Sequence, residues 1–436
     1  MSSGATHEAV AAVWRIESAR LIGALLRLVR SVELAEDLAQ EALIAALERW
    51  PESGIPDNPG AWLMTTAKHR ALDHLRQRKM QQRKHEQIGR EAASSQGDEP
   101  TLQAGLEHDV GENFGDDLLR LIFIACHPVL SREARAALTL KMLGGLATEE
   151  IARAFLVPEP TMAQRIVRAK RTLGEARVPF ELPQSAELQN RLSSVLEVIY
   201  LIFNEGYAAT SGDTWMRPEL CQEALRLGRI LAQLMPAEAE VHGLLALMEL
   251  NASRLPARVD TQGQPILLLD QDRTRWDQLL LHRGLTALQR AEKLKQPLGP
   301  YTLQAAIAAC HARARDAAQT DWPRIVALYD ALAELTLSPI VELNRAVAVS
   351  MAFGPGAGLE LLAPLAEEPA LKTYHLLPSV RGDLLFKLGR YAEATGEFQR
   401  AAAMTQNACE RTLLLRRAEE SRGNQASAKR HISIVR

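Results

Sequence analysis

Two neighbouring segments of this chain carry opposite charge. Residues 33–48 contain five carboxylates and no Lys or Arg, whereas residues 68–84 contain seven Lys or Arg side chains and one acid. A short loop that contains Pro and Gly joins them. Acidic helices often bind basic protein surfaces, and basic helices bind nucleic-acid phosphates. The chemistry expected of these residues is therefore binding, to one protein partner and to one nucleic acid.

A second group of polar residues has the side chains that catalysis or metal binding would need. It comprises Asp270, Asp272, Arg273, Asp277, His282 and His311. No His-Glu-x-x-His motif, no paired metal-ligand spacing and no Gly-rich phosphate loop accompanies them. We therefore predict that the chain is not an enzyme and uses no cofactor or metal. For residues 268–276, LLDQDRTRW, we expect a charged loop whose Asp and Arg side chains pair with one another.

The composition predicts an all-α fold. The 436 residues are rich in Ala, Leu, Arg, Glu and Gln, and Asn-Gly hairpin dipeptides are absent. A chain of this length is expected to form two or three domains. Four widely spaced cysteines form no Cys-x-x-Cys pair, and no apolar run approaches the roughly 20 residues that span a bilayer. We expect a reduced, cytoplasmic protein that does not enter a membrane.

The spacing of apolar residues predicts the elements that position the charged segments. Residues from His7 to about Lys84 form a compact helical unit. Its second helix is expected to start near Glu33 and to end before Pro51, and its third helix starts at Pro59. The apolar stripe of the third helix comprises Trp62, Leu63, Ala67, Ala71 and Leu75. We assign residues 1–85 to this domain, and residues 86–116, rich in Ser, Gly and acids, to a solvated linker.

Residues 117–180 are predicted to form a second small helical domain. Ser131 is a candidate N-cap, Gly144 and Gly145 end the helix that follows, and Thr148 is the candidate cap of a short helix. A last helix with several basic residues completes the layout of a helix-turn-helix. Its core-facing residues are expected to be Ile166, Val167 and Leu173.

Residues 183–436 are predicted to be a helical-repeat domain. Amphipathic stripes follow one another with short Pro or Gly breaks, which is typical of a solenoid. Residues 382–404 fit one tetratricopeptide-type helix pair in the order Leu388, Gly389, Tyr391, Ala394, Phe398 and Ala402. Residues 257–276 interrupt the pattern and predict a loop or a short β excursion.

The motifs of the first 180 residues resemble those of bacterial sigma-70-type factors. Residues 37–50, DLAQEALIAALERW, resemble regions 2.1–2.2, and residues 58–79 resemble regions 2.3–2.4 of the extracytoplasmic-function subgroup. Residues 130–173 resemble region 4, and the remainder resembles the long C-terminal extension of one group of these factors. Two linked motifs in the right order are more specific than either alone.

The resemblance implies a factor that binds core RNA polymerase, through its β′ and β subunits, and promoter DNA. The acidic helix would dock on a coiled coil of β′. Its candidate core-polymerase-binding residues are Asp37, Leu38, Gln40, Glu41 and Glu48, with Leu43 as further apolar support. The candidates for contact with the -10 element are Trp62, Lys68, His69, Arg70, Asp73, Arg76 and Arg78. For Trp62, stacking on a base and packing in the core both stay open.

The helix-turn-helix would enter the major groove at the -35 element with the start of its last helix. Its candidate DNA-binding residues are Thr161, Gln164, Arg165, Arg168, Lys170 and Arg171. The Pro158-Glu159-Pro160 entry departs from the Ser/Thr-rich start usual in the family, which leaves the register of base contacts open by about a residue.

The repeat domain is expected to regulate the factor, because helical-repeat arrays form grooves that bind peptides or other domains. It would contact residues 1–180 or bind a regulatory protein or peptide. The alternative is a helix-turn-helix regulator with a protein-interaction scaffold, which acts without polymerase. Only a sigma factor gives the acidic helix a function.

Overall fold

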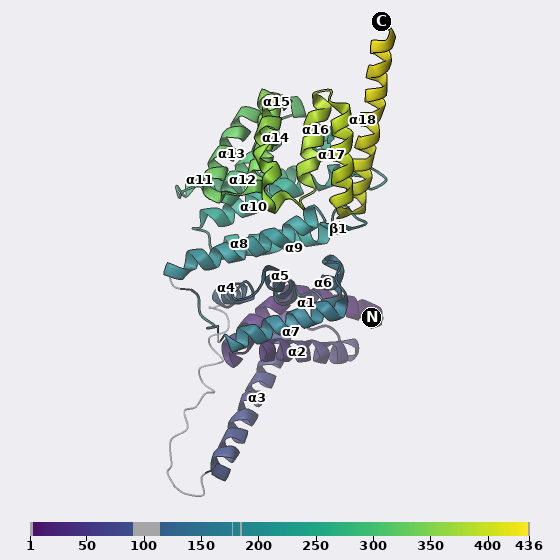
Figure 1. Ribbon diagram of the computed structural model, residues 1–436. Coiled ribbons are helices and arrows are strands. Elements are labelled where there is room, and N and C mark those ends of the chain that lie inside the picture. The colour runs from purple at the N-terminus through teal and green to yellow at the C-terminus, as the bar shows by residue number, and fades with distance from the viewer. Residues whose placement is uncertain (1–2, 90–113, 177, 184, 435–436) are drawn as a thin grey trace. The chain divides into compact units, whose positions relative to one another are not determined.

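The computed structural model describes residues 3–89, 114–176, 178–183 and 185–434 (Figure 1). Within this part of the chain it contains eighteen α-helices and two strands of two residues each. The predicted all-α fold is therefore confirmed. The chain divides into two compact units, residues 1–199 and 200–436. Most of the predicted linker lies outside the described residues. No described helix is both long enough and apolar enough to cross a membrane.

The first three helices pack on one another, as the apolar spacing predicts. They are α1 (Ser3–Val29), α2 (Val32–Ser53) and α3 (Pro59–Gly89). The hydroxyl of Ser31 caps α2 by accepting from the Leu34 amide at 3.3 Å. The expectation that α2 ends before Pro51 is wrong. Pro51 lies in the last turn, so its missing N–H and its ring disturb only the end of the helix, and α2 ends at Gly54, whose φ is 82°.

Four further helices form the helix-turn-helix domain. They are α4 (Phe114–Ala125), α5 (Arg132–Met142), α6 (Thr148–Ala154) and α7 (Glu159–Glu175). The predicted cap at Ser131 is confirmed, because its hydroxyl accepts from the Ala134 amide at 3.3 Å. The predicted cap at Thr148 is wrong by one residue. Ala147 is the N-cap, and its amide donates to the Glu150 carboxylate at 2.8 Å.

The remaining helices form a repeat array in which, from α9 onward, most pack on helices near them in sequence. The array is preceded by α8 (Ser185–Tyr207), which runs through the boundary between the two units. The others are α9 (Pro218–Leu234), α10 (Ala239–Ala252), α11 (Gln278–Lys293), α12 (Pro300–Arg313), α13 (Trp322–Thr336), α14 (Pro339–Phe353), α15 (Pro355–Leu362), α16 (Leu376–Lys387), α17 (Tyr391–Met404) and α18 (Ala408–Ile434). Six 3-10 turns lie between them: η1 (Leu255–Ala257), η2 (Leu268–Asp270), η3 (Arg273–Arg275), η4 (Ala317–Gln319), η5 (Pro364–Glu367) and η6 (Pro369–Leu371).

Two short β contacts join segments of the repeat array. Strands β1 (Ser211–Gly212) and β2 (Gln406–Asn407) pair in parallel, so the loop after α8 is attached to the start of α18. An isolated antiparallel bridge joins Val259 to Pro265. The predicted β excursion within residues 257–276 is thus confirmed, and it is combined with the turns η1, η2 and η3.

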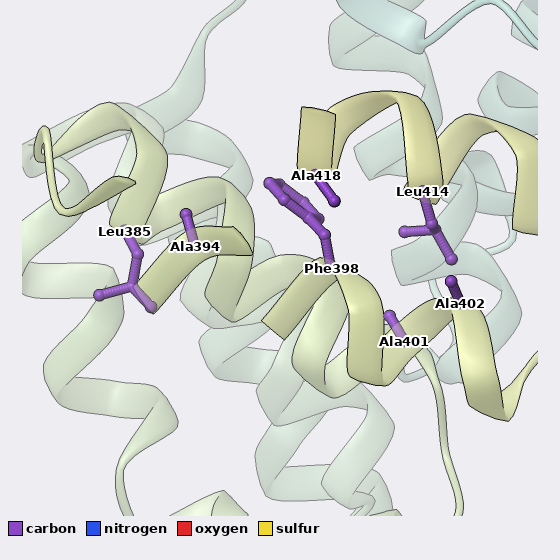
Figure 2. Close-up of a cluster of buried hydrophobic side chains, with 7 residues drawn as sticks. All are labelled: Leu385, Ala394, Phe398, Ala401, Ala402, Leu414 and Ala418. Atoms are coloured by element: carbon purple, nitrogen blue, oxygen red, sulfur yellow. The ribbon is translucent and has the colours of Figure 1, made fainter. Parts of the chain in front are cut away.

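The predicted tetratricopeptide-type pair is α16 and α17, which pack around Phe398 together with α18 (Figure 2). Gly389 turns the chain between them with a φ of 74°. A Cβ on Gly382 would lie 3.0 Å from the Phe398 ring, so the close approach of the two helices depends on a glycine there. The cluster comprises Leu385, Ala394, Phe398, Ala401, Ala402, Leu414 and Ala418.

Replacing Phe398, which is 2% exposed, should create a cavity between α16, α17 and α18. We expect Phe398→Ala to lower the free energy of unfolding of the second unit by about 3–5 kcal/mol. Chemical denaturation followed by circular dichroism measures it. Phe353→Ala is the matched control, because Phe353 is 67% exposed, and its effect should stay below about 0.5 kcal/mol. Equal effects of the two substitutions would contradict this packing.

Candidate functional site

The acidic face of α2 is exposed on the first unit. The side chains of Asp37, Glu41 and Glu48 are exposed, and Gln40 is half-buried. Partial burial raises the pKa of Asp37, Glu36 raises it further, and Lys170 lowers it. Leu38 is only 3% exposed and lies in the core. It contributes to the packing of α2 in the core, and its side chain does not reach the surface that a partner would touch.

The basic helix α3 buries one face and exposes the other. Leu63, Ala67 and Ala71 are at most 1% exposed, as the predicted stripe requires. The exposed face carries His69, Asp73, Arg76 and Arg78, and Lys68 and Arg70 are half-buried. Arg76 pairs with Asp73 at 3.3 Å. Burial lowers the pKa of Lys68, and the charge of Arg27 lowers it further.

Two contacts connect α3 to α2. Arg70 donates to the Glu41 carboxylate at 3.0 Å, so a basic candidate on one helix is paired with an acidic candidate on the other. Trp62 is half-buried and packs edge-to-face against Trp50, with ring centroids 5.4 Å apart. Trp50 itself is 2% exposed. Trp62 therefore contacts the core while keeping part of its ring accessible.

The last helix of the helix-turn-helix, α7, buries one face and exposes the other. Met162, Ile166, Ala169 and Leu173 are buried against α5 and α6. The expectation that Val167 faces the core is wrong, since it is 58% exposed; it lies one position beyond the buried stripe, about a quarter-turn round the helix. The exposed candidates follow helical spacing along one stripe. They are Thr161, Gln164, Arg168 and Arg171.

Lys170 points away from that exposed stripe. Its ammonium lies 2.6 Å from the carboxylate of Glu36 on α2, and the two side chains are 15% and 3% exposed. The other oxygen of Glu36 accepts from the Gln40 amide at 3.0 Å. A candidate DNA-binding residue is therefore held by the helix that carries the candidate polymerase-binding residues. The sequence did not single out Glu36, because only its place among the buried residues Ala35 and Ala39 distinguishes it from the other acids.

Further contacts hold the helix-turn-helix against α1 and α2. Arg27 pairs with the buried Asp117 at 3.5 Å, and Arg15 pairs with Glu150 at 2.7 Å. Two glycines allow close approach. A Cβ on Gly23 would lie 3.1 Å from the carbonyl oxygen of Asp117, and one on Gly145 would lie 2.7 Å from the Ser18 hydroxyl. The first unit therefore has a closed arrangement.

A groove of about 720 Å³ lies within this closed arrangement. Gln40, Leu43 and Ile44 of α2 form part of its wall, and Glu149 and Arg153 of α6 form another part. Ile44 is 52% exposed, although it is a large apolar side chain. One edge of the candidate polymerase-binding face thus faces α6 instead of open solvent.

The start of α8 is anchored on the helix-turn-helix domain. The Ser194 hydroxyl accepts from Arg135 and donates to the carbonyl of Cys126 at 2.6 Å. Glu197 pairs with Arg135 at 3.1 Å and with Arg132 at 2.6 Å. Arg191 donates to the carbonyl of Phe123 at 3.0 Å. The part of α8 that belongs to the first unit therefore contacts α4, α5 and the carbonyl of Cys126. Sequence reasoning missed these residues, because each is an ordinary polar residue of an amphipathic helix.

The polar residues considered for catalysis do not form one site. Asp272 caps η3 and Asp277 caps α11, while Asp270 and His282 are exposed. The expectation that the Asp and Arg side chains of residues 268–276 pair with one another is wrong. Arg273 instead donates to the carbonyls of His311 and Ala314, at 2.6 and 2.7 Å. Within the described ranges, no group of three or more His, Cys, Asp or Glu residues is placed to hold a metal ion.

Three segments of the chain match known families. Residues 14–80 match Sigma-70 region 2, residues 120–173 match Sigma-70, region 4, and residues 191–292 match a family of unknown function (DUF6596). These matches coincide with α1–α3, with α4–α7 and with the first helices of the repeat array.

Several individual proteins are also similar to this chain. An uncharacterized protein of Rhizobium meliloti is 44% identical over 389 residues, which are 89% of this chain and 90% of that protein. A probable ECF RNA polymerase sigma factor of Mycobacterium tuberculosis is 29% identical over 172 residues, 39% of this chain and 57% of that protein. The RNA polymerase sigma-H factor of Pseudomonas aeruginosa is 26% identical over 161 residues, 37% of this chain and 82% of that protein.

Reversing the charge of Lys170 should open the closed arrangement of the first unit. Lys170→Glu places two carboxylates together, and loss of a buried pair of this kind costs about 3–5 kcal/mol. We expect faster hydrogen–deuterium exchange in peptides of α2 and α7. Adding Glu36→Lys should restore slow exchange. Arg171→Glu, the same charge change on the exposed face of α7, is the control. Unchanged exchange in Lys170→Glu would contradict the closed arrangement.

Proposed function

We propose a mode of action that starts from one premise: this chain belongs to the sigma-70 family of RNA polymerase sigma factors, as an extracytoplasmic-function type with a C-terminal extension. Its function is that of a sigma factor for RNA polymerase, and the family acts by binding rather than by catalysis. The observation that carries the premise is the presence of both sigma-70 regions, in the family's order, in one chain. The protein would act in the cytoplasm, where bacterial transcription takes place.

The proposed polymerase contact is the exposed acidic face of α2. Asp37, Glu41 and Glu48 are exposed, and residues 33–48 contain no Lys or Arg, although Glu41 pairs with Arg70 of α3 at 3.0 Å. Such a surface favours a basic partner, and the family resemblance suggests the β′ coiled coil, with β as a further contact. Leu38 and Leu43 would support this face and would not dominate the contact.

The proposed promoter contacts lie on α3 and α7. On α3 the exposed basic residues Arg76 and Arg78 would bind phosphates of the -10 element, and the accessible part of Trp62 would stack on an unpaired base. On α7 the stripe from Thr161 to Arg171 would face the -35 element, with Gln164 and Arg168 near its centre. Arg165 and Lys170, which are half-buried in the closed unit, would contribute after opening.

The closed first unit is proposed to be the resting form of the factor. Lys170 is engaged with Glu36, and part of the α2 face lines the groove beside α6. Polymerase binding would separate the helix-turn-helix from α1 and α2 and would free both surfaces. Polymerase must then supply enough binding free energy to replace the contacts of the closed form.

Regulation by the C-terminal extension is proposed to act through α8. The Ser194 and Glu197 side chains attach the start of this helix to the helix-turn-helix domain, and the same helix continues to Tyr207 in the repeat array. A regulatory protein, peptide or small molecule that reshapes the array would then change the position of α8. The helix-turn-helix would respond because α4 and α5 hold the helix directly.

The polymerase contact predicts the effect of a charge reversal on α2. Asp37→Lys should weaken binding to bacterial core RNA polymerase by about tenfold or more, because like charges at an interface repel. Fluorescence anisotropy with labelled protein measures the dissociation constant. Glu52→Lys, at the exposed end of the same helix, is the matched control and should bind normally. Unchanged polymerase affinity in Asp37→Lys would contradict the proposed contact on α2, whereas DNA binding without any polymerase binding by the wild type would favour a regulator that acts without polymerase.

The coupling through α8 predicts the effect of removing one hydroxyl. Ser194→Ala leaves Arg135 and the Cys126 carbonyl with fewer partners and should weaken the attachment of α8 by about 1–3 kcal/mol. We expect transcript yield from a promoter that the wild-type factor is first shown to recognise to change, while polymerase affinity does not. The neighbouring exposed Ser193 provides the control, Ser193→Ala. If the two variants transcribe alike, regulation does not pass through this contact.

A further inference from the structure

Two arginines of the second unit are buried beside aromatic rings. Arg254 and Arg258 lie at the end of α10 and around η1, and they are 9% and 7% exposed. They belong to the segment between α10 and α11 that interrupts the helical repeat. The sigma-factor function described above makes no use of either residue.

The guanidinium of Arg258 contacts aromatic rings and pairs with no carboxylate of the described residues. Its guanidinium carbon lies 3.5 Å from the centroid of the Tyr207 ring and 5.6 Å from that of Trp215. No ion pair or side-chain hydrogen bond joins it to the part of the chain that the structure describes, and its Nε is buried without a partner. Cation–π contact compensates part of the lost hydration, but it satisfies none of the five N–H groups.

Arg254 also lacks an acidic partner among the described residues. It donates one hydrogen bond, to the Asn251 side chain, and its Nε is also buried without a partner. The rings of Tyr207 and Trp276 lie 5.8 and 6.0 Å from its guanidinium carbon. Burial lowers the pKa of Arg254, and the charge of Arg258 lowers it further. No carboxylate of the described chain pairs with it.

The neighbouring polar groups do not supply the missing negative charge. Arg273 adds a third cation near Trp276, at 5.1 Å, but its Nη1 donates to two backbone carbonyls and its Nη2 to the hydroxyl of Thr320. The imidazole of His311 is 7% exposed, and its Nδ1 lacks a partner. Burial, together with Arg254 and Arg273, lowers the pKa of His311 to about 4, so at neutral pH it is uncharged.

Buried guanidinium groups without an acid are costly, because buried charges normally have a partner, and a bound anion would supply the missing one. The Nη2 of Arg254 is bonded to Asn251, while its Nη1 and both Nη atoms of Arg258 are not among the buried unpaired atoms. These Nη atoms therefore keep some contact with solvent. A guanidinium fork matches the geometry of a phosphate or carboxylate group with two parallel hydrogen bonds.

We propose that Arg254 and Arg258 form a binding site in the C-terminal extension for a small molecule that carries a phosphate or carboxylate group. The anionic group is bound by the free Nη atoms, and Tyr207 and Trp215 pack beside it. His311 contributes as a neutral hydrogen-bonding group. The site lies entirely within the second unit, so its existence does not depend on how the sigma domains work.

The test uses the 436-residue protein in thermal unfolding and titration calorimetry. The probes are inorganic phosphate and malonate, each compared with sodium chloride at equal ionic strength, because anions of this kind also stabilise proteins non-specifically. The variants are Arg258→Gln and Arg254→Gln. The matched control is Arg275→Gln, which removes an exposed arginine from the same segment.

We expect one of the two probes to raise the melting temperature of the wild type and of Arg275→Gln by about 2–4 °C, with saturation. The increase should be lost in Arg258→Gln and in Arg254→Gln. Phosphate alone would identify a phosphate ligand, and malonate alone a carboxylate. Without a probe, both arginine variants should melt no lower than the wild type, because each removes an unpaired buried charge.

Two results would overturn the proposal. The first is an equal increase in all four proteins, which is the non-specific effect of the salt. The second is no increase and no heat of binding with either probe. Suppose that neither probe binds and that both arginine variants, without a probe, melt well below the wild type. Arg254 and Arg258 would then have a purely structural role on Tyr207 and Trp276.

Discussion

The closed form of the first unit depends on an ion pair between a side chain of α7 and a buried side chain of α2. Lys170 lies on α7, but its side chain points to α2. Its ammonium lies 2.6 Å from the carboxylate of Glu36, which is nearly inaccessible to solvent. Removing Lys170 would leave the carboxylate of Glu36, which is 3% exposed, with only the Gln40 amide as a partner, and this is more costly than losing a surface pair. The contact therefore adds α2 to the helices that cover α7, beside α5 and α6. It also places the candidate surfaces for polymerase and for DNA under one common constraint.

A single helix gives the C-terminal extension access to that arrangement. The start of α8 is attached to α4 and α5 through Arg135, Ser194 and Glu197, and its end carries Tyr207, on which Arg258 rests. An anion bound at the proposed site would lie beside Tyr207, a residue of this same helix. This link connects the proposed ligand site to the proposed regulation.

Local patterns were predictable from the sequence, and contacts between distant segments were not. Ser131 as a cap and the turn at Gly389 depend on neighbouring residues, and the structure has both. Pro51 was expected to end a helix, yet the last turn tolerates it. Val167 was assigned to the core by its apolar type, although helical geometry turns it outward. The pairing of Lys170 with Glu36 has no local signature, because it depends on how two separate helical domains pack.

The distance between α2 and α7, measured in the free protein and in the complex with core polymerase, tests the account most directly. Dyes at Glu52→Cys and Gly174→Cys would report it by energy transfer, with the half-buried Cys409 replaced; Cys126, Cys221 and Cys310 are buried. The account predicts high transfer in the free protein and a marked fall when bacterial core RNA polymerase binds. A complex that forms with unchanged transfer would contradict the closed resting form, and the absence of any complex would contradict the proposed polymerase contact.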